Sequence, residues 1–247
     1  MTEDGKVAVV TGGTRGIGAA IAGALAERGV RLVLNGRGRD PEVDSLLDDL
    51  RAITRTELVL GNAASPDTAA MMVEHALKHF GRVDYVVAAA GGAYPGTILD
   101  LSEETWLDAF RVHVHAVFHL FKAAHAALAR EGGGFLMIGS AAGLRGCPAS
   151  IAYQTVKGAL PPMARALARD HGHENIRVNA ILPGIIRTRF HAAMTREAER
   201  NNLDNRIPLH RFGSSEDVAS AALELLTNRF ITGETLVIDG GMSMRMV

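Results

Sequence analysis

The sequence predicts a single-domain α/β protein, a doubly wound parallel sheet with helices on both faces. Short apolar runs, many of them rich in β-branched residues, alternate along the chain with segments of helical periodicity. Most of these runs are apolar throughout, which is typical of strands buried on both faces of a parallel sheet. No linker, internal repeat or low-complexity stretch divides the chain. We therefore expect residues 1–247 to form one domain with right-handed strand–helix–strand crossovers.

The local patterns give the expected elements. The strands are expected at Val7–Thr11, Leu32–Asn35, Leu58–Leu60, Tyr85–Ala89, Phe135–Gly139, Val178–Leu182 and Leu236–Ile238. The helices are expected at Ile17–Arg28, Thr68–Phe80, Glu103–Arg130, Ser150–Asp170 and Ser215–Leu226. Pro161 and Pro162 lie inside the fourth of these helices, where each removes a backbone donor and crowds a preceding carbonyl. We expect a bend there, and the pattern leaves open whether the bend adjusts Lys157.

The composition excludes several classes of partner. The formal net charge is −1 and the basic residues form no dense block, so neither nucleic acid nor an anionic membrane is an expected partner. The N-terminus is acidic and lacks the features of a signal peptide, and no apolar run approaches the ~20 residues of a membrane helix. The single cysteine, Cys147, excludes an internal disulfide. We expect a soluble, cytoplasmic protein.

A glycine-rich loop follows the first predicted strand and opens the first predicted helix. It reads Thr11-Gly12-Gly13-Thr14-Arg15-Gly16-Ile17-Gly18. Glycines permit a tight turn and let a pyrophosphate approach the N–H groups at the helix N-terminus, where the helix dipole favours negative charge. The spacing of Gly12, Gly16 and Gly18 differs from the commoner G-x-G-x-x-G. Its place after the first strand nevertheless predicts a dinucleotide site.

The end of the second predicted strand indicates which dinucleotide binds. An acidic residue there would hold the adenosine ribose of NAD, but no acid occurs before Asp40. Arg37 can instead contact a 2′-phosphate through two parallel hydrogen bonds, with Arg15 approaching from the glycine loop. The sequence therefore favours NADP(H), and NAD(H) remains possible.

A serine, a tyrosine and a lysine form a candidate catalytic set. Ser140 follows the fifth predicted strand, and Tyr153 and Lys157 share one face of the next helix because they are four residues apart. A free phenol has a pKa of about 10, so a nearby cation is needed for Tyr153 to exchange protons near neutrality. These residues, in a chain that opens with a nucleotide loop, together are a strong signal of a catalytic site.

Taken together, these motifs resemble those of the short-chain dehydrogenase/reductase (SDR) family, in its compact single-domain branch, over essentially the whole chain. The resemblance rests on the glycine loop, on Ser140 and Tyr153-x-x-x-Lys157, on Arg177–Gly184, and on the closing segments Ile231–Glu234 and Asp239–Gly241. It implies a Rossmann-type fold and hydride transfer between nicotinamide and a carbonyl or secondary alcohol. Tyr153 would be the general acid or base, Lys157 would also hold the nicotinamide ribose, and Ser140 would bind the substrate oxygen.

The resemblance also implies the cofactor site. Relatives carry Asn-Asn-Ala-Gly after the fourth strand, where this chain has Ala88-Ala89-Ala90-Gly91, so we expect weaker bracing between strands but an intact backbone contact. Asn62 takes the place of an aspartate that contacts adenine in relatives. The residues expected at the cofactor are Gly12, Thr14, Arg15, Gly16, Ile17, Gly18, Arg37, Asn62, Ala90, Gly91, Tyr153, Lys157, Pro183, Gly184, Ile186 and Thr188.

The sequence leaves the substrate open. By resemblance, a short lid around residues 188–207 covers the substrate, which could be a 3-oxoacyl thioester, a sugar or polyol, or a cyclic ketone. A nucleotide-binding sensor and a non-catalytic SDR-like subunit remain alternative functions. Relatives associate through the long helices, here Glu103–Arg130 and Ser150–Asp170, so a homotetramer is expected, with a dimer as the second choice.

Three histidines lie in the run Phe110–Phe121. His115 and His119 share a helical face, but no third zinc ligand is evident in register, so no metal site is expected. His113 falls where relatives carry the asparagine of the Asn–Ser–Tyr–Lys tetrad, whose backbone carbonyl helps to hold a water that links the lysine to solvent. We expect His113 to keep the carbonyl role, and its ring could join the proton path because histidine titrates near neutrality. A tolerated substitution with no role for the ring is the alternative.

Overall fold

The computed structural model describes residues 2–192 and 194–244 and contains one seven-stranded parallel sheet. The strand order is β3-β2-β1-β4-β5-β6-β7, so the direction of winding reverses between β1 and β4. This confirms the predicted fold class. The strands are β1 (Val7–Thr11), β2 (Arg31–Gly36), β3 (Thr56–Leu60), β4 (Tyr85–Ala88), β5 (Gly134–Ile138), β6 (Arg177–Pro183) and β7 (Thr235–Ile238).

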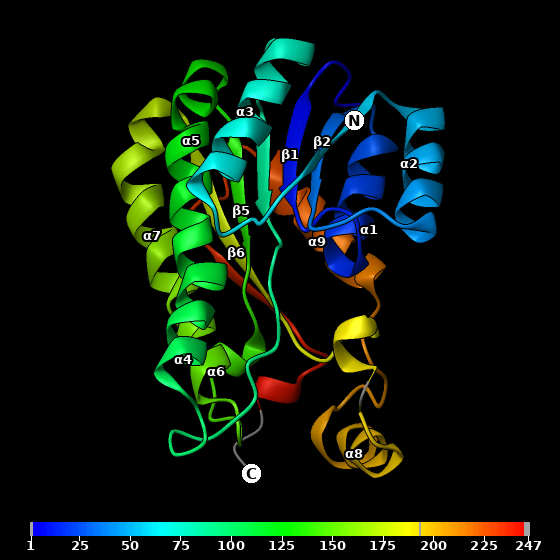
Figure 1. Ribbon diagram of the computed structural model, residues 1–247, viewed down its shortest axis with the longest axis vertical. Coiled ribbons are helices and arrows are strands. Elements are labelled where there is room, and N and C mark those ends of the chain that lie inside the picture. The colour runs from blue at the N-terminus through cyan, green and yellow to red at the C-terminus, as the bar shows by residue number, and fades with distance from the viewer. Residues whose placement is uncertain (1, 193, 245–247) are drawn as a thin grey trace.

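Helices cover both faces of the sheet (Figure 1). One face carries α3 (Pro66–Phe80), α5 (Ala116–Glu131) and α7 (Leu160–His171), and the other carries α1 (Gly16–Ala26), α2 (Pro41–Ile53) and α9 (Ser215–Thr227). Each face buries its own apolar cluster. Val9, Val86 and Phe135 pack under the first set of helices, and Val10, Val87 and Leu136 pack under the second. Because neighbouring residues alternate between the clusters, the strands are apolar throughout, as the sequence predicted.

The predicted helix Glu103–Arg130 is divided by a π-helical turn. It consists of α4 (Glu103–Phe110), the turn Arg111–His115 and α5. The backbone N–H of Ala116 donates to the carbonyl of Arg111, five residues earlier, which marks the wider turn. Such a turn accommodates an extra residue within a helix and often occurs at functional sites. Here it buries His113.

The predicted helix Ser150–Asp170 is interrupted at Ala159, between α6 (Ile151–Gly158) and α7. Pro161 and Pro162 lie in the first turn of α7, where their missing N–H groups cost little. The interruption is therefore where the prolines predicted a bend. It leaves Tyr153 and Lys157 on a short separate helix.

Two helices were not predicted from the sequence. The side chain of Asp40 accepts a hydrogen bond from the Val43 N–H at 3.1 Å and, with Pro41, starts α2. The second is α8 (Arg196–Asn201), inside the segment 188–207 that was expected to form a lid and of which residue 193 lies outside the described residues. The same segment contains a 3₁₀ turn (Arg189–His191) and a π turn (Asn202–Arg206). Within residues 2–192 and 194–244, no helix has the length and apolar character of a membrane span.

Candidate active site

The catalytic candidates converge at the carboxyl end of β5. Lys157 on α6 donates a hydrogen bond from Nζ to the carbonyl of Ile138, the last residue of β5, at 2.7 Å. Nζ lies 5.8 Å from the centroid of the Tyr153 ring, one helical turn earlier. Ser140 follows β5 and is buried, and its hydroxyl accepts a hydrogen bond from the Ala142 N–H at 3.2 Å. The structure therefore brings the three predicted residues together.

A close glycine contact sets α6 against the loop that carries Ser140. A Cβ atom on Gly143 would lie 2.7 Å from the backbone nitrogen of Gly158 and 2.8 Å from the carbonyl carbon of Lys157. Only a glycine allows this approach. The loop is also tied to α6 at Cys147, whose N–H donates to the side chain of Gln154 at 3.0 Å.

Burial shifts the pKa of both proton-carrying groups. It lowers the pKa of the Lys157 ammonium to about 7 and raises the pKa of Tyr153, and hydrogen bonding to Ser140 acts against the second of these shifts. From the sequence, we expect the charge of Lys157 to lower the pKa of the phenol. The structure differs because burial outweighs every other effect on Tyr153, and the ammonium is directed to the Ile138 carbonyl.

His113 lies inside the same cluster. Its ring packs edge-to-face against Tyr94 and Tyr153, with centroid distances of 5.6 and 5.7 Å. Nε2 donates to the Gly92 carbonyl at 3.0 Å, and Nδ1 is buried without a hydrogen-bond partner among the described residues. A Cβ atom on Gly91 would lie 2.7 Å from the ring, so the histidine and this glycine fit only together.

The expectation that His113 titrates near neutrality is wrong. Burial, and then the positive charge of Lys157, lower the pKa of its ring to about 3. The ring therefore stays neutral at the pH at which an enzyme of this kind works. His113 packs and hydrogen-bonds beside Tyr153, and the lowered pKa favours the neutral form of its ring.

The N-terminus of α1 has the features of a pyrophosphate site. Its N-cap residue, Arg15, has an extended backbone and makes no side-chain capping bond, so the side chain leaves the N–H groups of the first turn for another acceptor. Gly12 and Gly16 have φ angles of +62° and +51°. A Cβ on Gly12 would lie 2.9 Å from Cα of Ala90, whereas at Gly16 the nearest atom is 3.5 Å away, on Thr188. The residues present therefore fit a dinucleotide.

The other residues of the glycine loop pack inward. A Cβ atom on Gly18 would lie 2.3 Å from the carbonyl oxygen of Gly12, which closes the turn. Ile17 packs against the apolar cluster on the α1 face, and Thr14 is buried against Gly36 at the end of β2. These positions support the loop backbone.

The bracing that the sequence analysis expected to be lost is partly supplied by Thr11. Its Oγ1 accepts hydrogen bonds from the N–H groups of Ala89 and Ala90, at 3.2 and 3.3 Å, and lies 3.4 Å from the Val87 carbonyl, to which it donates. A side chain at the end of β1 thus ties the segment after β4 in place. Sequence reasoning missed this role, although Thr11 belongs to the quoted loop.

The two arginines expected at a 2′-phosphate differ in their surroundings. Arg15 forms ion pairs with Asp40 and Glu42, and Glu42 also pairs with Arg189. Arg37 is exposed and has no ion-pair partner within the described residues. Arg15 is thus not free as expected, because the start of α2 brings two carboxylates to it.

The adenine candidate lies apart from these groups. Asn62 is exposed, and its Oδ1 accepts a hydrogen bond from the Ala64 N–H at 3.0 Å. Its amide nitrogen has no hydrogen-bond partner in the described part of the chain. The structure therefore does not join Asn62 to the catalytic group.

The segment after β6 closes over the site. Pro183 ends β6, and Gly184 lies so close to β7 that its Cβ would be 2.7 Å from Cα of Asp239. The Ile186 carbonyl accepts a hydrogen bond from His191 Nδ1 at 2.9 Å, which holds the start of the lid. The centroid of the Phe190 ring lies 5.7 Å from that of the Tyr153 ring, so the segment expected to form a lid reaches Tyr153.

Comparisons with known proteins agree with this geometry. A family model described as enoyl-(acyl carrier protein) reductase matches residues 12–243. The dehydrogenase/reductase SDR family member 4 of Caenorhabditis elegans is 34% identical over 253 residues, which cover 98% of this chain and 97% of that protein. The chain belongs to the short-chain dehydrogenase/reductase family.

Two further matches to this SDR enzyme are a relative named for a substrate class and a solved structure that contains NADPH. A 3alpha-hydroxysteroid dehydrogenase of Mediterraneibacter gnavus is 36% identical over 246 residues, which cover 97% of this chain and 98% of that protein. The crystal structure of a blue fluorescent protein from a metagenomic library, in complex with NADPH, has a TM-score of 0.92 and 31% identity and covers 98% of this chain and all of that one. The enzyme is accordingly an NAD(P)-dependent oxidoreductase of small carbonyl or alcohol compounds.

Proposed function

We propose that this enzyme transfers a hydride between NADP(H) and a ketone or secondary alcohol, with Tyr153 as general acid in reduction and general base in oxidation. The observation that carries the proposal is the cluster of Ser140, Tyr153 and Lys157 at the end of β5, beside the segment Ala90–Gly92 and the lid. A sensor or a non-catalytic subunit would have no need of this set.

Each side chain has a separate task in this mechanism. The nicotinamide supplies or accepts the hydride when NADP(H) is bound. The Ser140 hydroxyl donates a hydrogen bond to the substrate oxygen, and the Tyr153 hydroxyl gives that oxygen its proton during reduction. Lys157 uses one of its three N–H groups on Ile138, which leaves two for ribose hydroxyls. His113 positions the phenol by packing against it.

We base the preference for NADP(H) on Arg37. It follows β2 and is exposed. Arg15 and Arg39 are each paired with a carboxylate, whereas Arg37 has no carboxylate partner among the described residues. Arg15 must exchange its partners before it can add a second contact to a phosphate. Asp40, the first acid after β2, is already bound to Arg15 and to the start of α2, so it is a poor ligand for ribose hydroxyls.

For the substrate, the lid favours an apolar ketone. The Phe190 ring stands over Tyr153 and is 45% exposed, so an apolar surface faces the place where the reacting carbon lies. Relatives are named for acyl carrier protein and hydroxysteroid substrates, both of which present hydrocarbon beside the reacting carbon. We therefore rank a 3-oxoacyl thioester or a cyclic ketone above a sugar or polyol.

The experiment is a screen of these carbonyl classes with NADPH and with NADH, in which turnover is measured by the change in nicotinamide absorbance. We expect turnover of an apolar ketone with NADPH. Arg37→Ala should raise the Michaelis constant for NADPH about 10- to 100-fold and leave that for NADH almost unchanged, because a bidentate phosphate contact is lost. Arg39→Ala is the matched control, since Arg39 is paired with Asp44. No turnover of any carbonyl, or equal effects of the two substitutions, would reject the proposal.

We also propose that the enzyme is a homotetramer and is located in the cytoplasm, with a dimer as the second choice for the assembly. Phe118 on α5 is 51% exposed, and Lys122 lies 5.9 Å from its ring centroid, so an apolar side chain remains on the outer face of a long helix. A second copy of the chain would cover it. The cytoplasmic assignment rests on the single cysteine, which suits a reducing compartment.

A further inference from the structure

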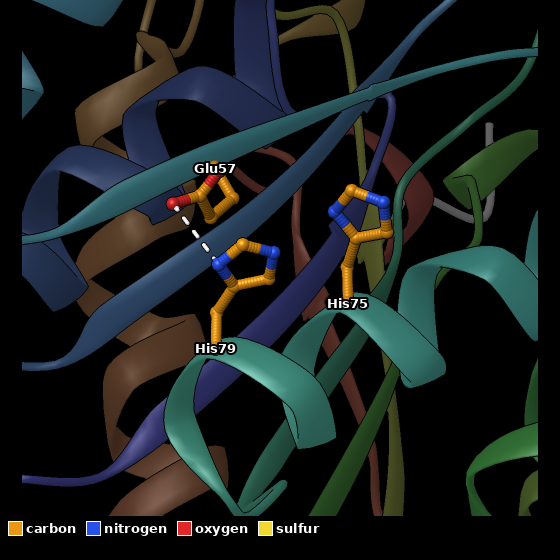
Figure 2. Close-up of side chains that lie close together, drawn as sticks. All are labelled: Glu57, His75 and His79. Carbon is orange, nitrogen blue, oxygen red and sulfur yellow. Dashed lines mark ion pairs between the residues drawn. The ribbon is translucent and has the colours of Figure 1, made fainter.

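Three side chains of metal-ligating type meet at the edge of the sheet, on elements that hold none of the catalytic residues. Glu57 lies on the edge strand β3, and His75 and His79 lie on α3 (Figure 2). The candidate ligand atoms of the three residues all lie within 4.8 Å of one another. All three side chains are half-buried, so the cluster is both shaped by the protein and open to an ion.

The fold explains why these residues converge. His75 and His79 are four residues apart on α3, so their rings lie one above the other, with centroids 5.3 Å apart. Glu57 lies two residues before Val59 on β3, so the two side chains are on the same face of the strand. Val59 is buried in the apolar cluster beneath α3. The carboxylate of Glu57 therefore points to the helix, and Figure 2 shows it beside the ring of His79.

Two nitrogens of the cluster make no hydrogen bond within it, although one of them lies at ion-pair distance from Glu57. Nδ1 of His75 is buried and has no hydrogen-bond partner among residues 2–192 and 194–244, and in Figure 2 it faces the His79 ring. His79 Nδ1 lies 3.7 Å from Glu57 Oε1, which is too long for a hydrogen bond. Two ligands of one tetrahedral zinc ion are separated by about 3.4 Å, given bonds of about 2.0–2.1 Å. The spacing suits an ion better than direct contact.

We propose that Glu57, His75 and His79 bind one divalent transition-metal ion of the zinc type. Two imidazoles and one carboxylate are a ligand set that zinc accepts, with water in the fourth position. The donors lie within 4.8 Å of one another, so the proposal requires the side chains to rotate until the donors reach the spacing of one ion. The ion would join the edge strand β3 to α3 and stabilise the fold at a distance from the chemistry.

A second cluster of the same composition is satisfied without an ion. Oε2 of Glu174 accepts hydrogen bonds from His171 Nδ1 at 2.7 Å and from His125 Nε2 at 3.0 Å. These direct hydrogen bonds explain why the three side chains of this cluster lie together, so no ion is needed there. It therefore supplies a matched control for the first cluster.

Two arginine side chains near the cluster should weaken its affinity for a metal ion. The guanidinium groups of Arg31 and Arg55 lie 5.3 and 5.0 Å from the ring centroid of Phe80, which in turn packs edge-on against His79. Their positive charge opposes a metal ion. We expect weaker binding than at a structural zinc site with four protein ligands.

Titration calorimetry with zinc chloride, on full-length protein freed of metal with a chelator, tests the proposal. The wild type should bind one zinc ion per chain, and zinc should raise its melting temperature. His75→Gln and His79→Gln should each weaken binding about 100-fold or more, because even the loss of a group behind a ligand costs about 10- to 100-fold. Glu57→Gln should weaken it to a smaller degree, and His171→Gln should bind as the wild type does.

Cobalt gives an independent reading of the ligand set. Wild type with Co²⁺ should develop the visible absorption of a four-coordinate site, and His79→Gln should lack it. His79→Gln also keeps the proposal testable if His75→Gln fails to fold. Absence of a one-to-one zinc site in the wild type would overturn the proposal, as would wild-type affinity in His79→Gln. So would loss of binding in His171→Gln.

Discussion

At the scale of single residues, Lys157 has the most unusual environment in the site. Its ammonium is buried and bonded to one carbonyl, and its pKa is lowered from 10.5 to about 7. A lysine this close to its pKa at neutral pH can exchange a proton with the group it serves. That property matches its proposed place behind Tyr153.

The lysine makes stability depend on pH. Below about pH 7 the side chain is charged in both the folded and the unfolded chain, and burial of that charge costs free energy. Between about pH 7 and 10.5 the unfolded chain keeps a proton that the folded chain has released. The free energy of unfolding should therefore rise with pH in this range, by about 1.4 kcal/mol per unit at most. Denaturant unfolding at several pH values, without added nucleotide, measures it. In Lys157→Met this contribution should vanish, and an unchanged slope would show that Lys157 is not its source.

His113 should behave differently from an acid–base residue. Since the pKa of its ring is lowered to about 3, the ring takes up no second proton and stays uncharged at pH 5 to 9, by a margin of about two units at least. His113→Asn should therefore change the magnitude of kcat and leave the shape of its pH profile as in the wild type. His113→Ala, which loses the packing against Tyr153 and the bond to Gly92, should lose more activity with the same shape. A pH limb that disappears in both variants would restore a proton-carrying role for the ring.

At the scale of elements, the short helix α6 depends on its contact with the loop after β5. Gly143→Ala should push α6 away from that loop, because the new methyl group would meet the backbone at Lys157 and Gly158 at under 3 Å. We expect a loss of about 1–3 kcal/mol in the free energy of unfolding and a fall in kcat, since Tyr153 and Lys157 move together. Gly146→Ala in the same loop meets nothing within 4 Å and is the control. Equal stabilities of the two variants would contradict this account of how α6 is positioned.

The sequence predicted elements well where one residue type decides the local structure. Pro161 and Pro162 located the break between α6 and α7, and the glycine loop located the start of α1. The π turn before α5 could not be predicted, because its cause is tertiary: the ring of His113 packs among Gly91, Tyr94 and Tyr153, which come from two other segments, the loop after β4 and α6. A single π turn of five residues is too short for apolar periodicity to distinguish it from an α-helix.

In the candidate site, too, the sequence predicted what local motifs determine and missed what tertiary contacts determine. Ser140, Tyr153 and Lys157 were predicted from motif and spacing, since strand order brings them to one end of the sheet. The ion pairs of Arg15 were not predicted, because they depend on α2, whose start at Asp40 the sequence analysis passed over. The protonation states were not predictable either, because burial decides them.

At the scale of the whole molecule, the outer face of α5 leads to a prediction about assembly. If that face is an interface between copies, Phe118→Asp should give particles smaller than the wild type in sedimentation velocity, because a charge would be buried where an aromatic ring packs. Ile53→Asp, at an equally exposed position at the end of α2, should leave the assembly unchanged. A wild type that sediments as a single chain would contradict the proposed tetramer.

The doubly wound sheet collects the proposed cofactor and substrate sites at one end. The strand order reverses between β1 and β4, and the glycine loop, the segment after β4, the catalytic residues and the lid all follow carboxyl ends of strands. Ligands of such sheets bind at this reversal. The cluster of Glu57, His75 and His79 lies instead at the β3 edge, which is why a metal there would act on stability and not on hydride transfer.

The most direct test of the account is hydride transfer by Tyr153→Phe, measured in a single turnover with NADPH and a ketone found in the screen. Binding of NADPH, followed by its fluorescence, should remain within a few-fold of the wild type, because the phenol hydroxyl is the only group removed. The rate of NADPH oxidation should fall about 10²- to 10⁴-fold, as expected when a general acid is lost. Turnover close to that of the wild type, with binding intact, would contradict the assignment of Tyr153 as the proton donor.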